Sequence, residues 1–216
     1  MTLLVARENT LWVLCKPSGV VVHAASEADA GRDVLSLARE QLGAPETLAA
    51  VHRLDRETSG VLLCSSDPAE RATLSAIFAS SEVVKRYLAL VFGRTRDKGI
   101  IRRALDDGRR GHPLEAVTRY RTRERLGGFS LLEVRPETGR KHQIRRHLTA
   151  IGHAVVGDSR YKPRRFRPVP GYVDRLWLHA AAIALPDGRR FEAPLPGELA
   201  AQLEHLRTGA AREPPA

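Results

Sequence analysis

Short apolar runs bounded by polar turns mark the first part of the chain. Leu11–Cys15, Val20–Val22 and Val61–Cys64 are runs of strand length without charged residues. Lys16-Pro17-Ser18-Gly19, between the first two runs, has the composition of a turn. The pattern therefore predicts three buried strands, since continuous apolar runs this short suit strands covered on both faces.

Helical spacing of apolar residues alternates with these runs. The clearest start is Asp67-Pro68 with Glu70 behind it, which has an N-cap residue, proline at the first position and an acidic first turn. Gly43 has the position of a helix end. Spacing predicts helices over 34–42, 67–80, 140–151 and 198–206.

Further strands are predicted in the second half of the chain, over 83–92, 115–124, 129–136 and 176–184, with a restart at Phe191. Residues 94–113 and 159–175 are rich in Arg and Lys, and we expect basic loops there. Strands and helices without regular alternation predict an α+β fold around a mainly antiparallel sheet. We expect one domain over 1–208 and a frayed tail over 209–216.

Composition narrows the class of protein. The 216 residues are 43% hydrophobic, which excludes a disordered chain, and no apolar run has the length of a membrane span. Cys15 and Cys64 lie in apolar runs without metal or redox spacing, which is typical of reduced core residues. With no signal peptide in the sequence, we expect a cytoplasmic protein.

The charge indicates a polyanionic partner. Lys and Arg number 35 against 25 acidic residues, for a net charge of +10, and 30 of these cations are Arg. Guanidinium groups bind phosphates bidentately and stack on bases, so a nucleic acid is the expected partner. A genomic preference for Arg codons is the simpler alternative, because the chain is also rich in Ala and poor in Lys.

Four polar clusters interrupt the apolar pattern. Each alone has an ordinary structural explanation: a solvated turn, a core tyrosine, a helix start or a turn aspartate. The third has a helix start that carries Arg140, Lys141 and His142, which favours phosphate binding. Its two histidines are five residues apart, which is not the spacing of a helical zinc pair. The clusters are His52–Gly60, Lys85–Tyr87, Thr138–Leu148 and His153–Asp158.

Together the clusters resemble the RluA-type RNA pseudouridine synthases. His52-Arg53-Leu54-Asp55 with Thr58-Ser59-Gly60 is similar to the family signature, and Lys16-Pro17-Ser18-Gly19 resembles its N-terminal motif. The later motifs follow in the family's order: the Tyr of Lys85-Arg86-Tyr87, then Thr138–Arg145, Gly157-Asp158 and Leu178-His179-Ala180. The resemblance covers roughly Leu11 to Pro196. It implies that family's catalytic domain fold, a mainly antiparallel mixed sheet with flanking helices and loops around a central cleft.

The resemblance also implies a reaction and a set of roles. The family detaches uracil from its ribose in RNA and rejoins it through C5, with no cofactor and no metal. By similarity, Asp55 is the catalytic carboxylate and Arg145 its ionic partner. Tyr87 packs on the extruded base, Arg53 holds the opened nucleotide and Leu178 lines the pocket. A carboxylate suits this chemistry as a nucleophile or as a stabiliser of positive charge.

Alternatives remain open at this point. A glycosidase would use two carboxylates, but Glu57 is only two residues from Asp55 in the same loop. A non-catalytic RNA-binding protein would need no Asp55. The motifs look most like the branch that modifies tRNA near the acceptor and T stems, with large-subunit rRNA as the alternative substrate. We expect a monomer that lacks the S4-type domain of many relatives. We expect it to bind RNA through residues 94–112 and 160–167.

Overall fold

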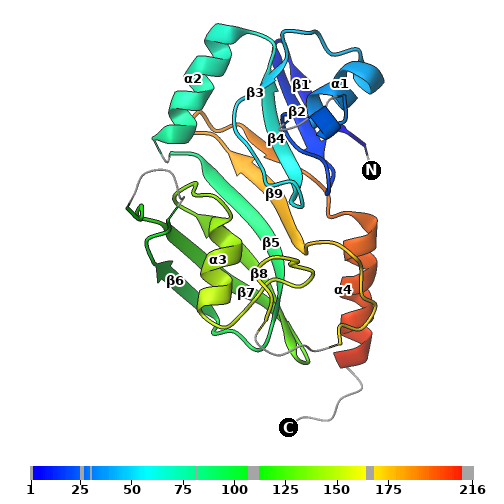
Figure 1. Cartoon of the computed structure of the whole chain (residues 1–216), viewed down its shortest axis with the longest axis vertical. Coiled ribbons are helices and arrows are strands. Elements are labelled where there is room, and N and C mark those ends of the chain that lie inside the picture. Colours follow the sequence, from blue (N-terminus) through cyan, green and yellow to red (C-terminus); the bar gives the residue numbers. More distant parts are fainter. Residues whose placement is uncertain are drawn as a thin grey trace. The chain divides into compact units, whose positions relative to one another are not determined.

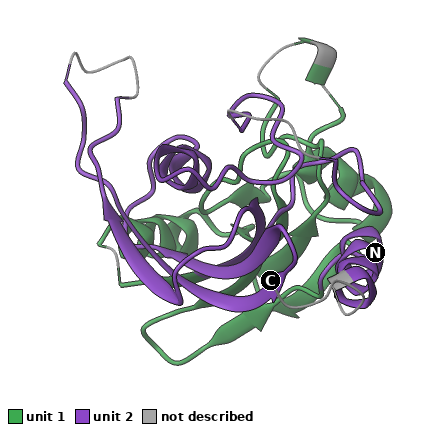
Figure 2. Ribbon diagram, turned by 90° about the horizontal axis from the view of Figure 1, so that it is seen from below, with its two compact units in different colours: residues 1–85, 180–194 green, residues 86–179, 195–216 purple. Residues whose placement is uncertain are grey.

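A computed structural model describes residues 2–24, 27–29, 31–80, 82–106, 112–163 and 168–210. The chain divides into two compact units (Figure 2). Unit 1 comprises Met1–Lys85 and Ala180–Pro194, and unit 2 comprises Arg86–His179 and Leu195–Ala216. The chain therefore passes from one unit to the other three times, twice inside a strand.

Unit 1 is built on antiparallel strands. β1, β2 and β4 pair in that order, and β3 pairs with the end of β4 (Figure 1). β9 enters unit 1 at Ala180 and pairs with β10. The strands are β1 (Leu4–Glu8), β2 (Leu11–Lys16), β3 (Ala49–Ala50), β4 (Ser59–Ser65), β9 (Leu178–Ala184) and β10 (Arg190–Glu192). The apolar runs at β2 and β4 are fully buried, as the sequence predicted.

The helices of unit 1 begin and end where their caps require. A short 3-10 helix, η1 (Glu27–Asp29), precedes α1 (Val34–Leu42), which ends at Gly43 in the left-handed conformation. α2 (Pro68–Ala79) begins with Asp67 as N-cap, whose side chain accepts a hydrogen bond from the Ala69 amide. Both α-helices confirm the sequence prediction, because capping chemistry is local and readable.

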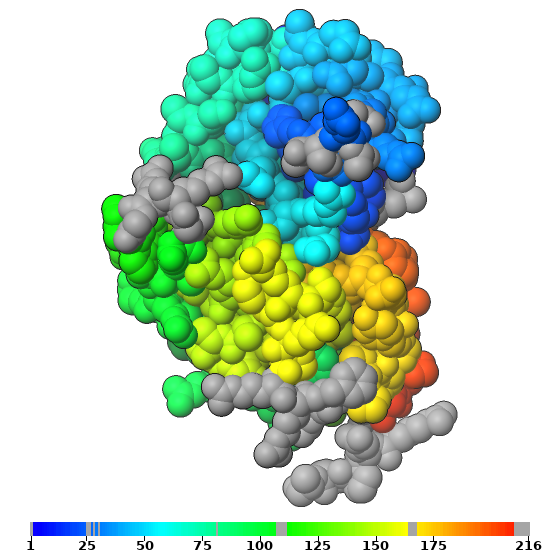
Figure 3. Space-filling view, viewed as in Figure 1, coloured from blue at the N-terminus to red at the C-terminus, as the bar shows by residue number. Residues whose placement is uncertain are grey.

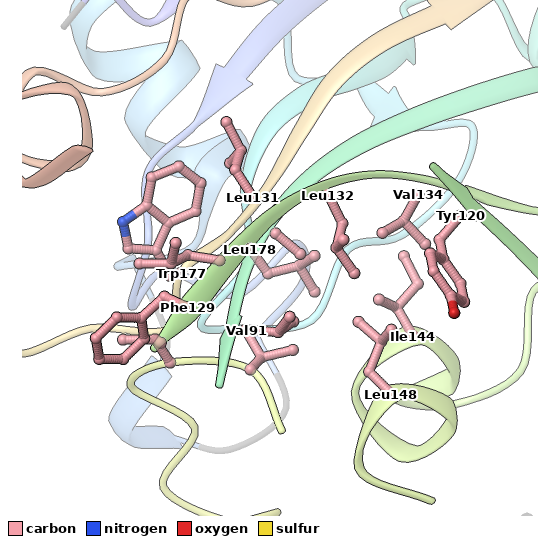
Figure 4. Close-up of a cluster of buried hydrophobic side chains, with 14 of the residues drawn as sticks. Val91, Tyr120, Phe129, Leu131, Leu132, Val134, Ile144, Leu148, Trp177 and Leu178 are labelled. Atoms are coloured by element: carbon pink, nitrogen blue, oxygen red, sulfur yellow. The ribbon is translucent and has the colours of Figure 1, made fainter. Parts of the chain in front are cut away.

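Unit 2 contains a sheet of four antiparallel strands in the order β5-β8-β7-β6. They are β5 (Val84–Phe92, in unit 2 from Arg86), β6 (Lys98–Arg102), β7 (Val117–Leu126) and β8 (Phe129–Pro136). α3 (Gln143–Ala150) lies on one face, where Ile144 and Leu148 meet Leu132, Val134 and Tyr120 (Figure 4). We call this the inner face. α4 (Gly197–Ala210) packs against β7, where Arg207 pairs with Glu124.

Three sequence expectations differ from the structure. Val20–Val22 forms no strand, because the Val20 and Val21 carbonyls accept bonds from the Lys16 ammonium and the Val34 amide. β6 lies inside the expected loop, and its pairing with β7 makes it a strand despite its charges. Helix α3 begins at Gln143 and not at residue 140, for a reason given below.

The combination of strands and helices is an α+β fold, as expected. A single domain over 1–208 stays a prediction. α4 extends four residues beyond its expected end at 206 and so includes the first two residues of the expected tail, of which residues 211–216 lie outside the described residues. Over the described ranges, the structure contains no helix long and apolar enough to cross a membrane.

Candidate active site

In unit 1, Asp55 lies on the loop between β3 and β4. The loop ends in a tight turn, in which the Thr58 amide donates to the Asp55 carbonyl at 3.1 Å. Leu54 is buried beside it, while the Asp55 side chain is partly exposed and Arg53 is exposed. Leu54 thus anchors the loop beside Asp55.

Residues of the turn after β2 bind the backbone carbonyls of this loop. Lys16 is fully buried, and its Nζ donates to the carbonyls of Pro17, Val20 and Arg56 at 2.7–2.9 Å. The Ser18 hydroxyl donates to the Glu57 carbonyl, and the Gly19 amide donates to the Arg56 carbonyl. A buried ammonium is tolerated only when its donors are satisfied, so this turn and the Asp55 loop form one rigid assembly.

His52 and Gly60 fix the two ends of the loop. The His52 ring stacks on Phe78, and its Nε2 accepts a hydrogen bond from the Leu63 amide at 3.1 Å. Burial lowers the pKa of His52 to about 3, so the ring is a neutral acceptor. A Cβ on Gly60 would lie 2.2 Å from the Ala180 carbonyl oxygen, so only glycine permits β4 to approach β9 there.

In unit 2, Arg145 and Asp158 form a buried bidentate pair. Nε and Nη2 of Arg145 each donate to a different oxygen of Asp158 at 2.7 Å, and the two side chains are 1% and 0% exposed. Burial acts to raise the pKa of Asp158. The bonds from Arg145 and from the Tyr161 and Arg160 amides outweigh it and hold that pKa below its ordinary value. Asp158 therefore stays ionised and fixes the plane of the guanidinium.

The segment after α3 wraps around this pair. The Tyr161 amide donates to Asp158 at 2.8 Å, and the Tyr161 ring lies 5.3 Å from the Arg145 guanidinium carbon. The Tyr161 hydroxyl and His142 Nδ1 are 3.1 Å apart. Gly157 has φ +74, and a Cβ there would lie 1.9 Å from the Arg175 carbonyl oxygen. In the space-filling view, this yellow segment forms part of the surface of unit 2 (Figure 3).

A buried hydrogen-bond chain explains where α3 begins. Gln143 Oε1 accepts from the Thr138 hydroxyl and the Arg140 amide, and Nε2 donates to Val117 and Thr118 of β7. These bonds close residues 140–142 into a turn, with His142 in the left-handed conformation at φ +53. The residues expected in the first helical turn therefore precede the helix.

The same chain continues through α3. Thr118 Oγ1 lies 2.9 Å from His147 Nδ1, and His147 Nε2 lies 2.9 Å from the Arg103 carbonyl. Burial lowers the pKa of His147, so the ring is neutral. A carbonyl can only accept, so the proton belongs on Nε2 and Thr118 donates to Nδ1. The polar side-chain groups of Thr138, Gln143, Thr118 and His147 all have partners in this hydrogen-bond network, which fixes α3 on the sheet.

The remaining predicted residues also lie in unit 2. Tyr87 is half-buried in β5, opposite Val134, and packs against the core. Leu178 is buried in that core beside Trp177. Arg140 donates from Nε to the Glu115 carbonyl, and Lys141 is exposed.

Of the eight residues predicted for the site, unit 1 contains Asp55 and Arg53, and unit 2 contains Tyr87, Arg140, Lys141, His142, Arg145 and Leu178. In unit 2 the structure joins His142 and Arg145 through Tyr161. A contact between Asp55 and Arg145 stays a prediction. In the part of the chain that the structure describes, no three His, Cys, Asp or Glu side chains are grouped to hold a metal ion.

Comparisons with known proteins decide the family. Residues 10–150 match the family model described as RNA pseudouridylate synthase. The chain belongs to this family. Its members are isomerases that act on RNA, and the matched segment contains the Asp55 loop, Tyr87 and Arg145.

Curated synthases of this family are about one-third identical to the chain. An uncharacterized RNA pseudouridine synthase of Chloroflexus aurantiacus is 36% identical, over 89% of this chain and 65% of its own. Ribosomal large subunit pseudouridine synthase C of Salmonella typhi is 35% identical, over 94% and 69%. tRNA pseudouridine synthase C of Pectobacterium carotovorum is 34% identical, over 84% and 54%. The chain thus spans about two-thirds or less of these relatives.

A solved synthase structure agrees with the fold. Human RNA Pseudouridylate Synthase Domain Containing 4 superposes with a TM-score of 0.80 at 26% identity, over 94% of this chain and 92% of that one. The expected family and fold class are confirmed. The resemblance carried by the sequence motifs alone had indicated both.

Sequence reasoning missed the polar groups that hold the predicted residues. Gly157-Asp158 stood out as a motif but was interpreted as a turn, and nothing in the spacing pairs Asp158 with Arg145. Gln143 lay inside a recognised motif, yet its amide bonds depend on the position of β7. For Asp158 the signal present was a polar residue close behind an apolar run, which indicates a buried partner without naming it. Gln143 stands in a polar stretch and carries no such signal.

Proposed function

We propose that this protein isomerises a uridine to pseudouridine in RNA. The bond from C1′ of the ribose to N1 of uracil breaks, the base turns, and a bond from C1′ to C5 forms. The C5 proton leaves and N1 gains one, so no atoms are gained or lost overall. The observation that carries the proposal is Asp55, on a loop held at both ends, within a segment matched by the family model.

Each predicted site residue has a separate role in this proposal. Asp55 supplies the carboxylate that attacks the nucleoside or stabilises the cation formed as the glycosidic bond breaks. Arg145, whose plane Asp158 fixes, is the ionic partner of Asp55. Tyr87 packs on the uracil and assists proton transfer at C5, and Leu178 lines the pocket. Arg53 holds the extruded nucleotide, since the base must leave its stack before it can react.

We propose tRNA, near the acceptor and T stems, as the substrate, as the motif likeness indicates. Large-subunit rRNA is the second candidate, because the Salmonella typhi relative is named for it. The match covers 69% of that relative, compared with 54% of the tRNA pseudouridine synthase of Pectobacterium carotovorum. Arg140, Lys141 and His142 are proposed phosphate contacts in either case. We also propose a cytoplasmic monomer. Sedimentation of the purified protein tests the monomer.

Replacement of Asp55 by Asn tests the activity. The amide keeps the shape of the side chain and removes its charge, so we expect isomerisation to fall by at least about a thousandfold while RNA binding is retained. The measurement is nucleotide-resolution mapping of pseudouridine in total tRNA and rRNA, from cells without the gene and cells restored with each variant. The same mapping follows incubation of unmodified RNA with purified protein.

Asp187→Asn is the matched control, since Asp187 is an exposed aspartate of a turn in the same unit. We expect it to restore the missing site fully. A lost site in tRNA supports the first substrate and one in rRNA the second. Full restoration by Asp55→Asn would contradict the catalytic assignment. If cells without the gene lose no pseudouridine from tRNA or rRNA, and the purified protein forms none in vitro, the result would favour an RNA-binding protein without this activity.

A further inference from the structure

The outer face of the unit 2 sheet, opposite α3, bears a group of cations. Strand register places them together: Lys98 lies opposite Arg121, and Arg119 lies opposite Arg135. All of them are exposed. We define the strand patch as Lys98 and Arg102 of β6, Arg119, Arg121 and Arg123 of β7, and Arg135 of β8.

The patch is only partly neutralised. Glu137 pairs with Arg119, and Glu133 is shared between Arg123 and Arg135. Within the described residues, the side chains of Lys98, Arg102 and Arg121 have no ion-pair or hydrogen-bond partner. Six cations against two carboxylates leave a net charge of +4 on this surface.

The arrangement is costly for a sheet. Like charges directly opposite each other on neighbouring strands destabilise the pair, and the patch has two such pairs. Charges on an edge strand such as β6 are commonly explained as protection against edge-to-edge aggregation. That explanation does not extend to Arg119, Arg121 and Arg135, because β7 and β8 are interior strands of this sheet.

The position of the patch connects it to the α3 side of unit 2. α4 covers the other end of the outer face, where Glu124 lies opposite Leu131, so the patch is confined to the end near β6. Around that edge, α3 is bonded to the segment that follows β6. His147 bonds the Arg103 carbonyl, and Arg146 Nη1 donates to the Asp106 carbonyl at 2.7 Å. The segment that follows the β6 end of the patch is therefore fixed on α3.

We propose that the strand patch binds the phosphate backbone of the RNA substrate at a segment other than the reacting uridine. The proposal rests on the proposed function for the identity of the RNA. Cations two residues apart along a strand are spaced about 6.6–6.8 Å, and neighbouring strands add rows about 4.8 Å apart. Such a grid suits a polyanionic backbone bound without regard to sequence. The patch thus contributes affinity and leaves the chemical step unchanged.

The test replaces the three cations that lack partners, in the variant Lys98→Gln, Arg102→Gln, Arg121→Gln. The matched control is Arg7→Gln, Arg32→Gln, Arg190→Gln, which removes the same charge from exposed positions of unit 1. Binding of fluorescent bulk tRNA and of a large-subunit rRNA fragment is measured over a salt series. Turnover is measured on the full-length RNA in which wild type forms pseudouridine and on the shortest oligonucleotide from it that still reacts.

We expect the patch variant to bind RNA at least about tenfold more weakly, with a log–log salt slope shallower by about two to three. KM should rise on full-length RNA, with kcat unchanged and the short oligonucleotide unaffected. A salt slope equal to that of wild type, or an equal loss in the control, would overturn the proposal. The proposal would also be overturned if the patch variant lost binding to anionic lipid vesicles and still bound RNA as wild type does. Failure of wild type to form pseudouridine would count against the proposed function alone, because the binding slopes still decide the patch.

Discussion

At the scale of single residues, the candidate site depends on side chains that hold other side chains. Arg145 is buried, and a buried guanidinium is tolerated only with an ionised partner in good geometry. Asp158 supplies that partner and is itself held by two backbone amides. Asp158 is therefore a positioning residue, since it acts through Arg145.

Asp158→Asn tests this role. The substitution removes the carboxylate that fixes the plane of the buried Arg145 guanidinium, so we expect the free energy of unfolding to fall by about 3–5 kcal/mol. Activity at a temperature where the variant is folded should show a lower kcat with little change in KM. Denaturant melts and steady-state kinetics measure the two effects.

Glu137→Gln is the control for that variant, because its partner Arg119 is exposed and such surface pairs contribute about 1 kcal/mol or less. Equal effects of the two substitutions on stability would contradict the role of Asp158. Sequence could predict Arg145 from its motif, but its partner is thirteen residues away across a loop whose path depends on the Gly157 backbone. Pairing at that range is decided by tertiary structure.

At the scale of elements, the clearest case is the start of β4. The Thr58-Ser59-Gly60 part of the motif carries no chemistry of its own. The reason for its glycine is the backbone of β9, which leaves no room for a Cβ, together with φ +118. The glycine lets the strand that follows the Asp55 loop lie against its neighbour.

Gly60→Ala should destabilise the protein by about 3 kcal/mol or more, because the methyl group overlaps backbone atoms that have no rotamer to adopt. Gly43→Ala is the comparison. It also requires a positive φ, but no atom lies within 4 Å, so a cost of about 1 kcal/mol is expected. Thermal unfolding of both variants measures the difference. A Gly60 variant as stable as the Gly43 variant would exclude the close approach.

Elements with local signals were predicted well, and those without were not. α1, α2, β2 and β4 have caps or continuous apolar runs, and the structure places them within one or two residues of expectation. β6 reads Lys-Gly-Ile-Ile-Arg within a basic stretch and has no alternation of apolar and polar residues, so the sequence carries no sign of its pairing with β7. Residues 107–111 and 164–167 of the expected basic loops lie outside the described residues.

At the scale of the whole molecule, stability should depend on pH through buried imidazoles. Burial lowers the pKa of His52 to about 3, with help from the charge of Lys85 and against the backbone contact with Arg53. An unfolded histidine titrates near 6.5. The folded state therefore binds fewer protons, and the stabilisation is complete above about pH 6.5 and is lost as pH falls toward 3.

We expect the free energy of unfolding to fall by up to about 1.4 kcal/mol per pH unit for this one proton. In His52→Gln, the side-chain amide oxygen can accept the hydrogen bond from the Leu63 amide. The glutamine side chain does not titrate. Its stability should vary less with pH than that of wild type between pH 6.5 and 4. Denaturant melts across this range make the comparison. Parallel pH profiles for the two proteins would show that His52 is not held neutral.

The interleaving of the two units governs when the site can exist during synthesis. Residues 86–179 stand between the two parts of unit 1, so the strand that lies against Gly60 leaves the ribosome long after the Asp55 loop. Contacts between segments so distant in sequence form slowly and late in folding. Until residues 180–194 have been made, the nascent chain therefore lacks the completed support of the Asp55 loop.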